Sequence, residues 1–166
     1  EPSTKGGVSP ELTQILETLR ERLQPRDASN GRWDVAHMAL AEGWVFVDRQ
    51  DEAQREIEKV SSASAEQWLQ VLQSASPPAN ASAVERRNSA DWRMMLIDCA
   101  GSTAKNLDAS RLRLWDRLSV LALEDAGQVA AALEQIEPLM KQLPKDAELR
   151  ELHARLLTEA AETPNV

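Results

Sequence analysis

The chain has 166 residues, of which 42% are hydrophobic and 28% are charged, and its formal net charge is −8. These values are typical of a globular protein with a sizeable core. The negative charge argues against general binding to nucleic acid or to an anionic membrane, because both require positive charge facing phosphate. A single cysteine, Cys99, excludes an internal disulfide. We expect no membrane span, because no stretch approaches the roughly 20 apolar residues that one needs.

Helix-forming residues dominate the sequence, and we predict an all-α fold of about 7–8 helices. The helices are expected to form antiparallel hairpins, stacked as a short solenoid or packed as an irregular bundle. We predict a flexible leader over 1–8, a single domain over 9–160 and a flexible tail over 161–166. The chain begins with Glu1 rather than Met, so we expect a trimmed form, which leaves both a cytoplasmic and an exported or anchored location open.

Capping and breaking residues place the helices along the chain. Ser9 and Pro10 predict the start of the first helix, and Asn30-Gly31 predicts a turn after it. The later helices are expected over about 33–48, over about 51–60, and from Ser64 to a Pro/Ala/Ser-rich break at 74–82. The next is expected from the capping pair Ser82 and Glu85, or from a later start at Ser89, to Gly101. The last three are expected over about 109–125, after Gly127, and from Asp146 to 160. Pro138 predicts a kink or interruption near Glu137.

A helical hairpin pattern is clearest over 114–144. Gly127 falls at the turn, Ala132 and Ile136 follow in the second helix, and Pro144 closes the unit. This pattern resembles a tetratricopeptide repeat, a helical hairpin of about 34 residues. The helix over 147–160, with Ala154 and Leu157 at the small and large positions, resembles the solvating helix that ends such arrays.

A weaker copy lies over 35–60. Its first helix keeps the apolar triplet and its second keeps two packing residues, but Asp48 and Ala65 stand where the turn glycine and the closing proline would be. The residues that match are Leu40, Ala41, Trp44, Ala53 and Ile57. The distance between the two copies is not a multiple of the repeat length, and residues 61–108 match the pattern of neither copy. A non-repeating helical bundle is therefore the competing interpretation.

The resemblance implies a groove that binds a protein or peptide, lined by first-helix residues outside the core stripe. The candidate partner-binding residues are Met38, Glu42, Val45, Phe46, Arg117, Leu121 and Glu124, with Val35, Leu114 and Asp125 beside them. The apolar members need a cover. The leucine-rich first helix, with Leu16 and Leu19, is the simpler candidate for that cover, and a partner peptide is the alternative.

No residue pattern indicates catalysis, a metal site or a cofactor. His37 and His153 lack companions at ligand spacing, and Cys99 lies on an apolar stripe with Trp92 and Met95, as an inert buried thiol would. Four carboxylates are expected among solvated helix charges: Glu56, Glu58, Glu124 and Asp125. Six arginines over 84–120 could form a basic patch, but charged outer helix faces are the simpler interpretation. They are Arg86, Arg87, Arg93, Arg111, Arg113 and Arg117.

Three functions therefore compete. The first is a non-catalytic helical-repeat module for protein–protein interaction, possibly within a larger assembly or a longer chain. The second is a structural domain that self-associates through a Trp/Met-rich surface, for which Trp33 is the tryptophan to test for exposure. The third is an enzyme with an unrecognised site.

Overall fold

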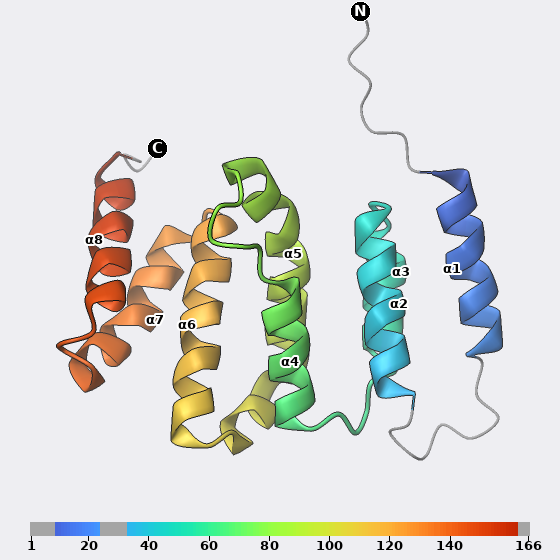
Figure 1. Ribbon diagram of the computed structural model, residues 1–166, viewed down its shortest axis with the longest axis horizontal. Helices are drawn as coiled ribbons and strands as arrows, with labels where there is room; N and C mark the ends of the chain where they lie inside the picture. Colours follow the sequence, from blue (N-terminus) through green and yellow to red (C-terminus); the bar gives the residue numbers. More distant parts are fainter. Residues whose placement is uncertain (1–8, 24–32, 163–166) are drawn as a thin grey trace, which may run out of the picture. The chain divides into compact units, whose positions relative to one another are not determined.

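The computed structural model describes residues 9–23 and 33–162. In these ranges the regular elements are all helices, which confirms the all-α prediction (Figure 1). They are α1 (Pro10–Arg22), α2 (Asp34–Phe46), α3 (Gln50–Ile57), α4 (Ala65–Ala75), α5 (Ala83–Ala100), the short 3-10 helix η2 (Gly101–Asn106), α6 (Ala109–Asp125), α7 (Val129–Gln142) and α8 (Ala147–Glu162). Among the described helices, none has the length and apolar character needed to cross a bilayer.

The capping residues begin helices as predicted. The Ser9 hydroxyl accepts a hydrogen bond from the Leu12 amide, with Pro10 in the first turn of α1. Ser82 and Glu85 form a reciprocal capping box at the start of α5. The Asp146 carboxylate accepts hydrogen bonds from two backbone amides at the start of α8. These contacts satisfy backbone donors that a helix N-terminus otherwise leaves unpaired.

Two predicted boundaries differ from the structure. α7 continues through Pro138, so the predicted interruption near Glu137 is absent. Pro138 is exposed, whereas Ile136 and Leu139 on either side are buried in the core, which holds the helix together despite the lost backbone hydrogen bond. α8 extends to Glu162, two residues into the predicted tail. The predicted leader, the remaining tail residues and the Asn30-Gly31 turn lie outside the described residues.

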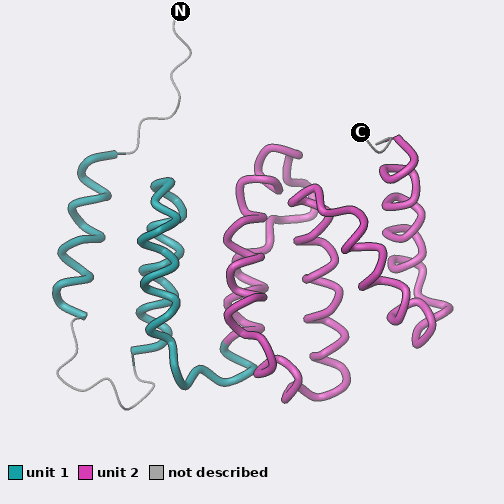
Figure 2. The backbone as a smooth tube through the Cα atoms, turned by 180° about the vertical axis from the view of Figure 1, so that it is seen from behind, with its two compact units in different colours: residues 1–67 teal, residues 68–166 magenta. Residues whose placement is uncertain are grey.

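The chain divides into two compact units, residues 1–67 and 68–166 (Figure 2). The division falls within α4 rather than at the break over 74–82. That break is present as the connection between α4 and α5, and the segment 61–108, unassigned by the repeat pattern, contains these two helices. The expectation of a single domain over 9–160 stays a prediction.

In the unit 1–67, α2 packs against α3 and α1 packs against α2. The matching residues of the weaker repeat copy, including Trp44, Ala53 and Ile57, are buried. α1 approaches α2 closely at Gly43, where an added Cβ would lie 2.5 Å from Leu16 Cδ2. The leucine-rich helix therefore covers α2 at Gly43. It does not cover Phe46, one of the apolar residues for which a cover was expected, because that side chain is 82% exposed.

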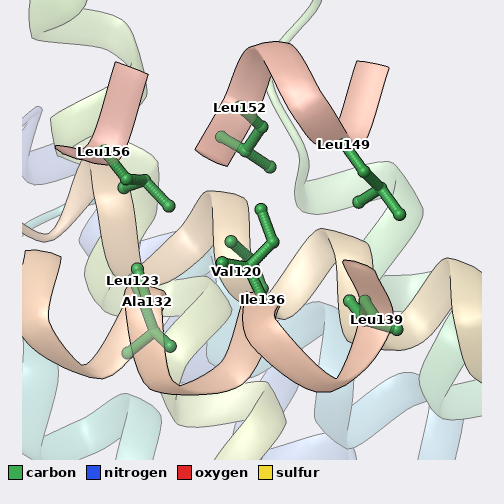
Figure 3. Close-up of a cluster of buried hydrophobic side chains, with 8 residues drawn as sticks. All are labelled: Val120, Leu123, Ala132, Ile136, Leu139, Leu149, Leu152 and Leu156. Carbon is green, nitrogen blue, oxygen red and sulfur yellow. The ribbon is translucent and has the colours of Figure 1, made fainter. Parts of the chain in front are cut away.

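In the unit 68–166, each helix from α5 onward packs against the next. A cluster of buried apolar side chains holds α6, α7 and α8 together. Its members are Val120, Leu123, Ala132, Ile136, Leu139, Leu149, Leu152 and Leu156. Figure 3 shows the three α8 leucines pointing toward the side chains of α6 and α7. Ala154 and Leu157, which occupy the other side of α8, are exposed.

The turns of the two hairpins have the same backbone geometry. Asp48, with φ 59°, and Gly127, with φ 75°, both lie in the left-handed region. The amide after each donates a hydrogen bond to the carbonyl five residues back, from Arg49 to Trp44 and from Gln128 to Leu123, each at 2.8 Å. This is the bonding of a helix C-terminus closed by a left-handed residue. The weaker copy therefore keeps the turn although it lacks the glycine.

Candidate functional site

A pocket of about 690 Å3 lies against one face of α6 in the unit 68–166. We call it the α6 pocket. Its lining residues are 76–79 of the loop, Ala83 and three arginines of α5, Leu118, Leu121, Glu124 and Asp125 of α6, Gly127, and Arg155 and Glu159 of α8. Three residues that the repeat resemblance placed in the groove line it: Leu121, Glu124 and Asp125. Leu121 and Glu124 share this face because they are three residues apart on a helix.

The pocket combines an apolar surface with charged walls. Leu118 and Leu121 of α6 are half-buried, so part of each side chain stays accessible. Pro77, Pro78 and Ala79 add apolar atoms from the opposite loop. Proline restricts the backbone of this loop, so the loop would lose less conformational entropy when a ligand binds. Such a surface suits a segment that carries at least one apolar side chain.

Arg93 belongs to the part of α5 that lines the pocket. Its side chain is only 1% exposed, and its Nη2 donates to Asp125 Oδ2 at 2.8 Å and to the Arg86 carbonyl at 3.1 Å. Arg86 lies 3.4 Å from the other Asp125 oxygen and donates to the Ala81 carbonyl at 3.1 Å. These bonds tie α5 to the end of α6 and to the loop, so they position the pocket wall. The expectation that these arginines lie on outer helix faces is wrong for Arg93, because its carboxylate partner comes from α6.

A second ion pair, between α8 and α6, lines another side of the pocket. Arg155 contacts Glu124 through two parallel hydrogen bonds, of which the one from Nη2 to Oε2 measures 2.8 Å. The hydrogen bond to Glu124 raises the pKa of Arg155 above its ordinary value. This paired geometry fixes both side chains more firmly than a single contact would.

Arg87 is the uncommitted cation of the pocket. It is exposed on α5, and in the described part of the chain its side chain takes part in no hydrogen bond or ion pair. The neighbouring arginines Arg86, Arg93 and Arg155 all contact carboxylates. Arg87 is therefore the group with most donor capacity left for a ligand.

The remaining predicted partner-binding residues lie elsewhere. Arg117 is paired with Glu148 of α8. Met38 is 1% exposed and so belongs to the core rather than to a binding surface. Glu42 is exposed, Val45 is half-buried and Phe46 is 82% exposed. These last four residues belong to the unit 1–67 and do not line the α6 pocket.

The sequence alone did not identify the α5 and α8 walls. Arg86, Arg87 and Arg93 stood out as a basic segment, but nothing indicated that they face α6. Arg155 and Glu159 carried no signal of their own. The usable signal was the local excess of arginine over 84–120 in an acidic chain.

A buried charge cluster in the unit 1–67 is the other concentration of titratable groups. Glu56 is fully buried, contrary to the expected solvated position. Its carboxylate accepts hydrogen bonds from Arg20 Nε at 2.6 Å and Lys59 Nζ at 2.8 Å, and it lies 2.9 Å from His37 Nδ1. Burial raises the pKa of Glu56, but the hydrogen bonds from Lys59, Arg20 and His37 outweigh it, so the pKa lies below its ordinary value.

The same cluster attaches α1 to the α2–α3 hairpin. Arg20 of α1 also donates to Glu52 at 2.5 Å, and this hydrogen bond lowers the pKa of Glu52. The Arg20 and Arg49 guanidinium groups lie 5.1 and 5.7 Å from the centre of a Trp44 ring, within the range of cation–π attraction. Both oxygens of Glu56 are engaged in contacts between helices, so we interpret the cluster as structural.

Over the described ranges 9–23 and 33–162, no group of three His, Cys, Asp or Glu side chains is arranged to hold a metal ion. Comparison of the chain with protein-family models, with curated proteins and with solved structures gave no significant match.

Proposed function

We propose that this chain is a non-catalytic helical-hairpin module that binds a segment of another protein in the α6 pocket. The observation that carries the proposal is the pocket itself, in which an apolar surface is combined with an uncommitted arginine. The likeness of 114–160 to a tetratricopeptide repeat supports the proposal, because stacked hairpins of that kind serve as scaffolds for protein recognition.

The pocket has the features of a peptide-recognition surface. Its charged side chains Arg93, Asp125, Glu124 and Arg155 are held by ion pairs across helices, so the walls are arranged before a ligand arrives. Preorganised walls reduce the entropy lost on binding. Apolar anchors on the ligand would contact Leu118 and Leu121, and an acceptor group would reach Arg87.

A displayed-peptide selection against the full chain tests this function. We expect enriched peptides whose affinity falls by about tenfold or more in Arg87→Glu, because reversing the charge replaces attraction by repulsion at the pocket. The matched control is Arg150→Glu, an exposed arginine of α8 that does not line the pocket. The control alters net charge equally and should leave the affinity within about twofold.

Two results would count against the proposal. One is a selection that enriches no peptide family. The other is an equal loss of affinity in Arg87→Glu and Arg150→Glu, which would assign the binding to net charge rather than to the pocket. Circular dichroism checks whether both variants keep their helices.

Self-association is the second candidate, favoured by apolar side chains on α1 and α2. Ile15, Leu19, Val35 and Phe46 are exposed by 54%, 45%, 52% and 82%. Among the tryptophans, Trp33 is 44% exposed and the other four are buried, so this surface has little Trp character. Sedimentation of the full chain and of Phe46→Glu at several concentrations tests the idea. A dimer that Phe46→Glu dissociates would support it, and a monomer at all concentrations would exclude it.

A further inference from the structure

A second hollow, of about 430 Å3, lies on the other side of α6. Its α6 residues are Ser119 and Leu123, whereas those of the α6 pocket include Leu118 and Leu121. Successive helix residues turn by about 100°, which places the two sets on opposite faces of α6. We call this hollow the α5–α7 hollow, because its other residues come from these two helices: Met94, Ile97, Asp98, Ala131, Glu134 and Gln135.

The floor of the α5–α7 hollow is apolar. Met94 and Ile97 of α5 and Ala131 of α7 are half-buried, and Leu123 lies below them with 8% exposure. The hydroxyl of Ser119 donates to the Trp115 carbonyl at 2.9 Å, so the one hydroxyl of the floor is already satisfied. Methionine and isoleucine side chains at such a position can adapt to an inserted apolar group.

The rim of the hollow carries uncompensated negative charge. Asp98 and Glu134 are exposed, and within the described residues neither carboxylate has a hydrogen bond or an ion pair. No lysine or arginine is among the residues that line the hollow. On α7 the first basic residue after Glu134 is Lys141, about 10 Å further along the helix axis. In the α6 pocket, by contrast, Glu124 and Asp125 are paired with arginines.

We infer that the α5–α7 hollow is a docking site for a basic amphipathic helix of a partner protein. The two carboxylates select the charge of the partner, because opposite potentials favour encounter and like charges repel. A lysine or arginine stem can lie along Met94 and Ile97 while its charged end reaches Asp98 or Glu134. Amphipathic helices commonly bind in apolar grooves between helices of a partner protein. This site is separate from the α6 pocket and does not depend on it.

The test uses a synthetic amphipathic helix of Leu and Lys, about 14 residues long, and a matched peptide of Leu and Glu. Methionine methyl groups in the full chain report the site, because Met94 lines the hollow and Met38 lies in the core of the other unit. We expect the Leu/Lys peptide to shift the Met94 methyl resonance and to leave that of Met38 unchanged.

Charge reversal at the rim provides the decisive comparison. The double variant Asp98→Lys with Glu134→Lys should raise the Kd of the Leu/Lys peptide by about tenfold or more. The double variant Glu151→Lys with Glu162→Lys changes the net charge equally at exposed α8 positions outside the hollow. It should change the Kd by less than about twofold, because distant surface charges are screened at about 0.1 M salt.

Any of three results would overturn the inference. They are equal weakening in the two double variants, equal binding of the Leu/Glu peptide, and methyl shifts that omit Met94. A dimer of the chain that the Leu/Lys peptide cannot dissociate would also overturn it, because a second copy would then occupy the hollow. Because all four substituted residues are exposed, we expect the variants to fold, and circular dichroism checks this expectation.

Discussion

The α2–α3 and α6–α7 hairpins share a turn geometry but bury different chemistry. Between α2 and α3 lies the fully buried carboxylate of Glu56, with His37 beside it and Arg20 reaching it from α1. Between α6 and α7 lie apolar side chains such as Val120 and Ile136. Sequence patterns of small and large apolar residues therefore identify a hairpin without showing what holds its neighbours in place.

The difference has consequences for stability and for function. An apolar cluster stabilises in proportion to the area it removes from water. A buried carboxylate gains little net stability, because its desolvation offsets much of the attraction, but removing its partners is costly. The charged cluster joins α1 and α2 to Glu56 of α3, and we expect it to contribute more to the way these helices pair than to their net stability. In the unit 68–166 the apolar cluster stabilises the helices. The ion pairs Arg93–Asp125 and Arg155–Glu124 lie outside this cluster and line the α6 pocket.

The largest expected effect comes from Ile136→Ala in the apolar cluster. Ile136 is fully buried, and truncating such a side chain costs about 2–5 kcal/mol of the free energy of unfolding. Residue-resolved hydrogen exchange should show lost protection over α6, α7 and α8. Leu157→Ala, at a position 51% exposed, is the control and should change little. Equal losses in both variants would contradict the assignment of the core.

A smaller effect is expected from Glu56→Gln, which keeps the shape and removes the charge. The loss should be about 1–3 kcal/mol, as for a buried charged hydrogen-bond acceptor. The pKa of Glu56 lies below its ordinary value of 4.5, so its stabilisation is present above that pH and is lost as pH falls further. Denaturation of the variant should therefore depend less on pH in the acid range.

The control for this prediction is Glu58→Gln. Glu58 is exposed, so Glu58→Gln should change the free energy of unfolding little, both at neutral pH and in the acid range. If Glu56→Gln and Glu58→Gln have the same acid denaturation profile, Glu56 is not the group that links the α2–α3 hairpin to pH.

Gly127→Ala tests the left-handed turn between α6 and α7, whose geometry the α2–α3 turn shares. Gly127 has φ 75° and open space around its Cβ direction, so the cost arises from the backbone rather than from a clash. We expect a loss of about 1–2 kcal/mol in thermal or urea unfolding. An unchanged midpoint would show that the turn relaxes to another conformation.

The complementary change, Asp48→Gly, should have the smallest effect and the opposite sign. Aspartate tolerates the left-handed region better than most residues, but glycine adopts it without penalty. Stability should rise by about 0.5 kcal/mol, because the strain relieved in the turn exceeds the flexibility gained in the unfolded chain. A loss of stability on calorimetry would indicate that the Asp48 side chain itself supports the turn.

Local sequence signals predicted most of the fold. Caps such as Ser9, Ser82 and Asp146 identified helix starts because their contacts span only a few residues. The helix-packing residues of both hairpin patterns, such as Trp44 and Ile57 in one and Ala132 and Ile136 in the other, are buried, because helical spacing defines one face. Burial of Glu56 was missed because Arg20 precedes it by 36 residues, and no local spacing reveals such a pairing.

The candidate site was less predictable than the fold. The repeat resemblance named Leu121 and Glu124, which come from a single helix, and both line the α6 pocket. The rest of the α6 pocket comes from the loop before α5, from α5 itself and from α8, so it depends on tertiary packing. Met38 was misplaced because its position on a helix does not show whether its side chain is buried in the folded unit.

The most direct test of binding in the α6 pocket is a map of backbone amide shifts in the labelled full chain on titration with a selected peptide. The account predicts changes concentrated in the loop 76–79, around Arg87, along α6 near Leu121 and at Arg155 of α8, with the amides of α2 and α3 unaffected. Changes confined to α2 and α3 would contradict it.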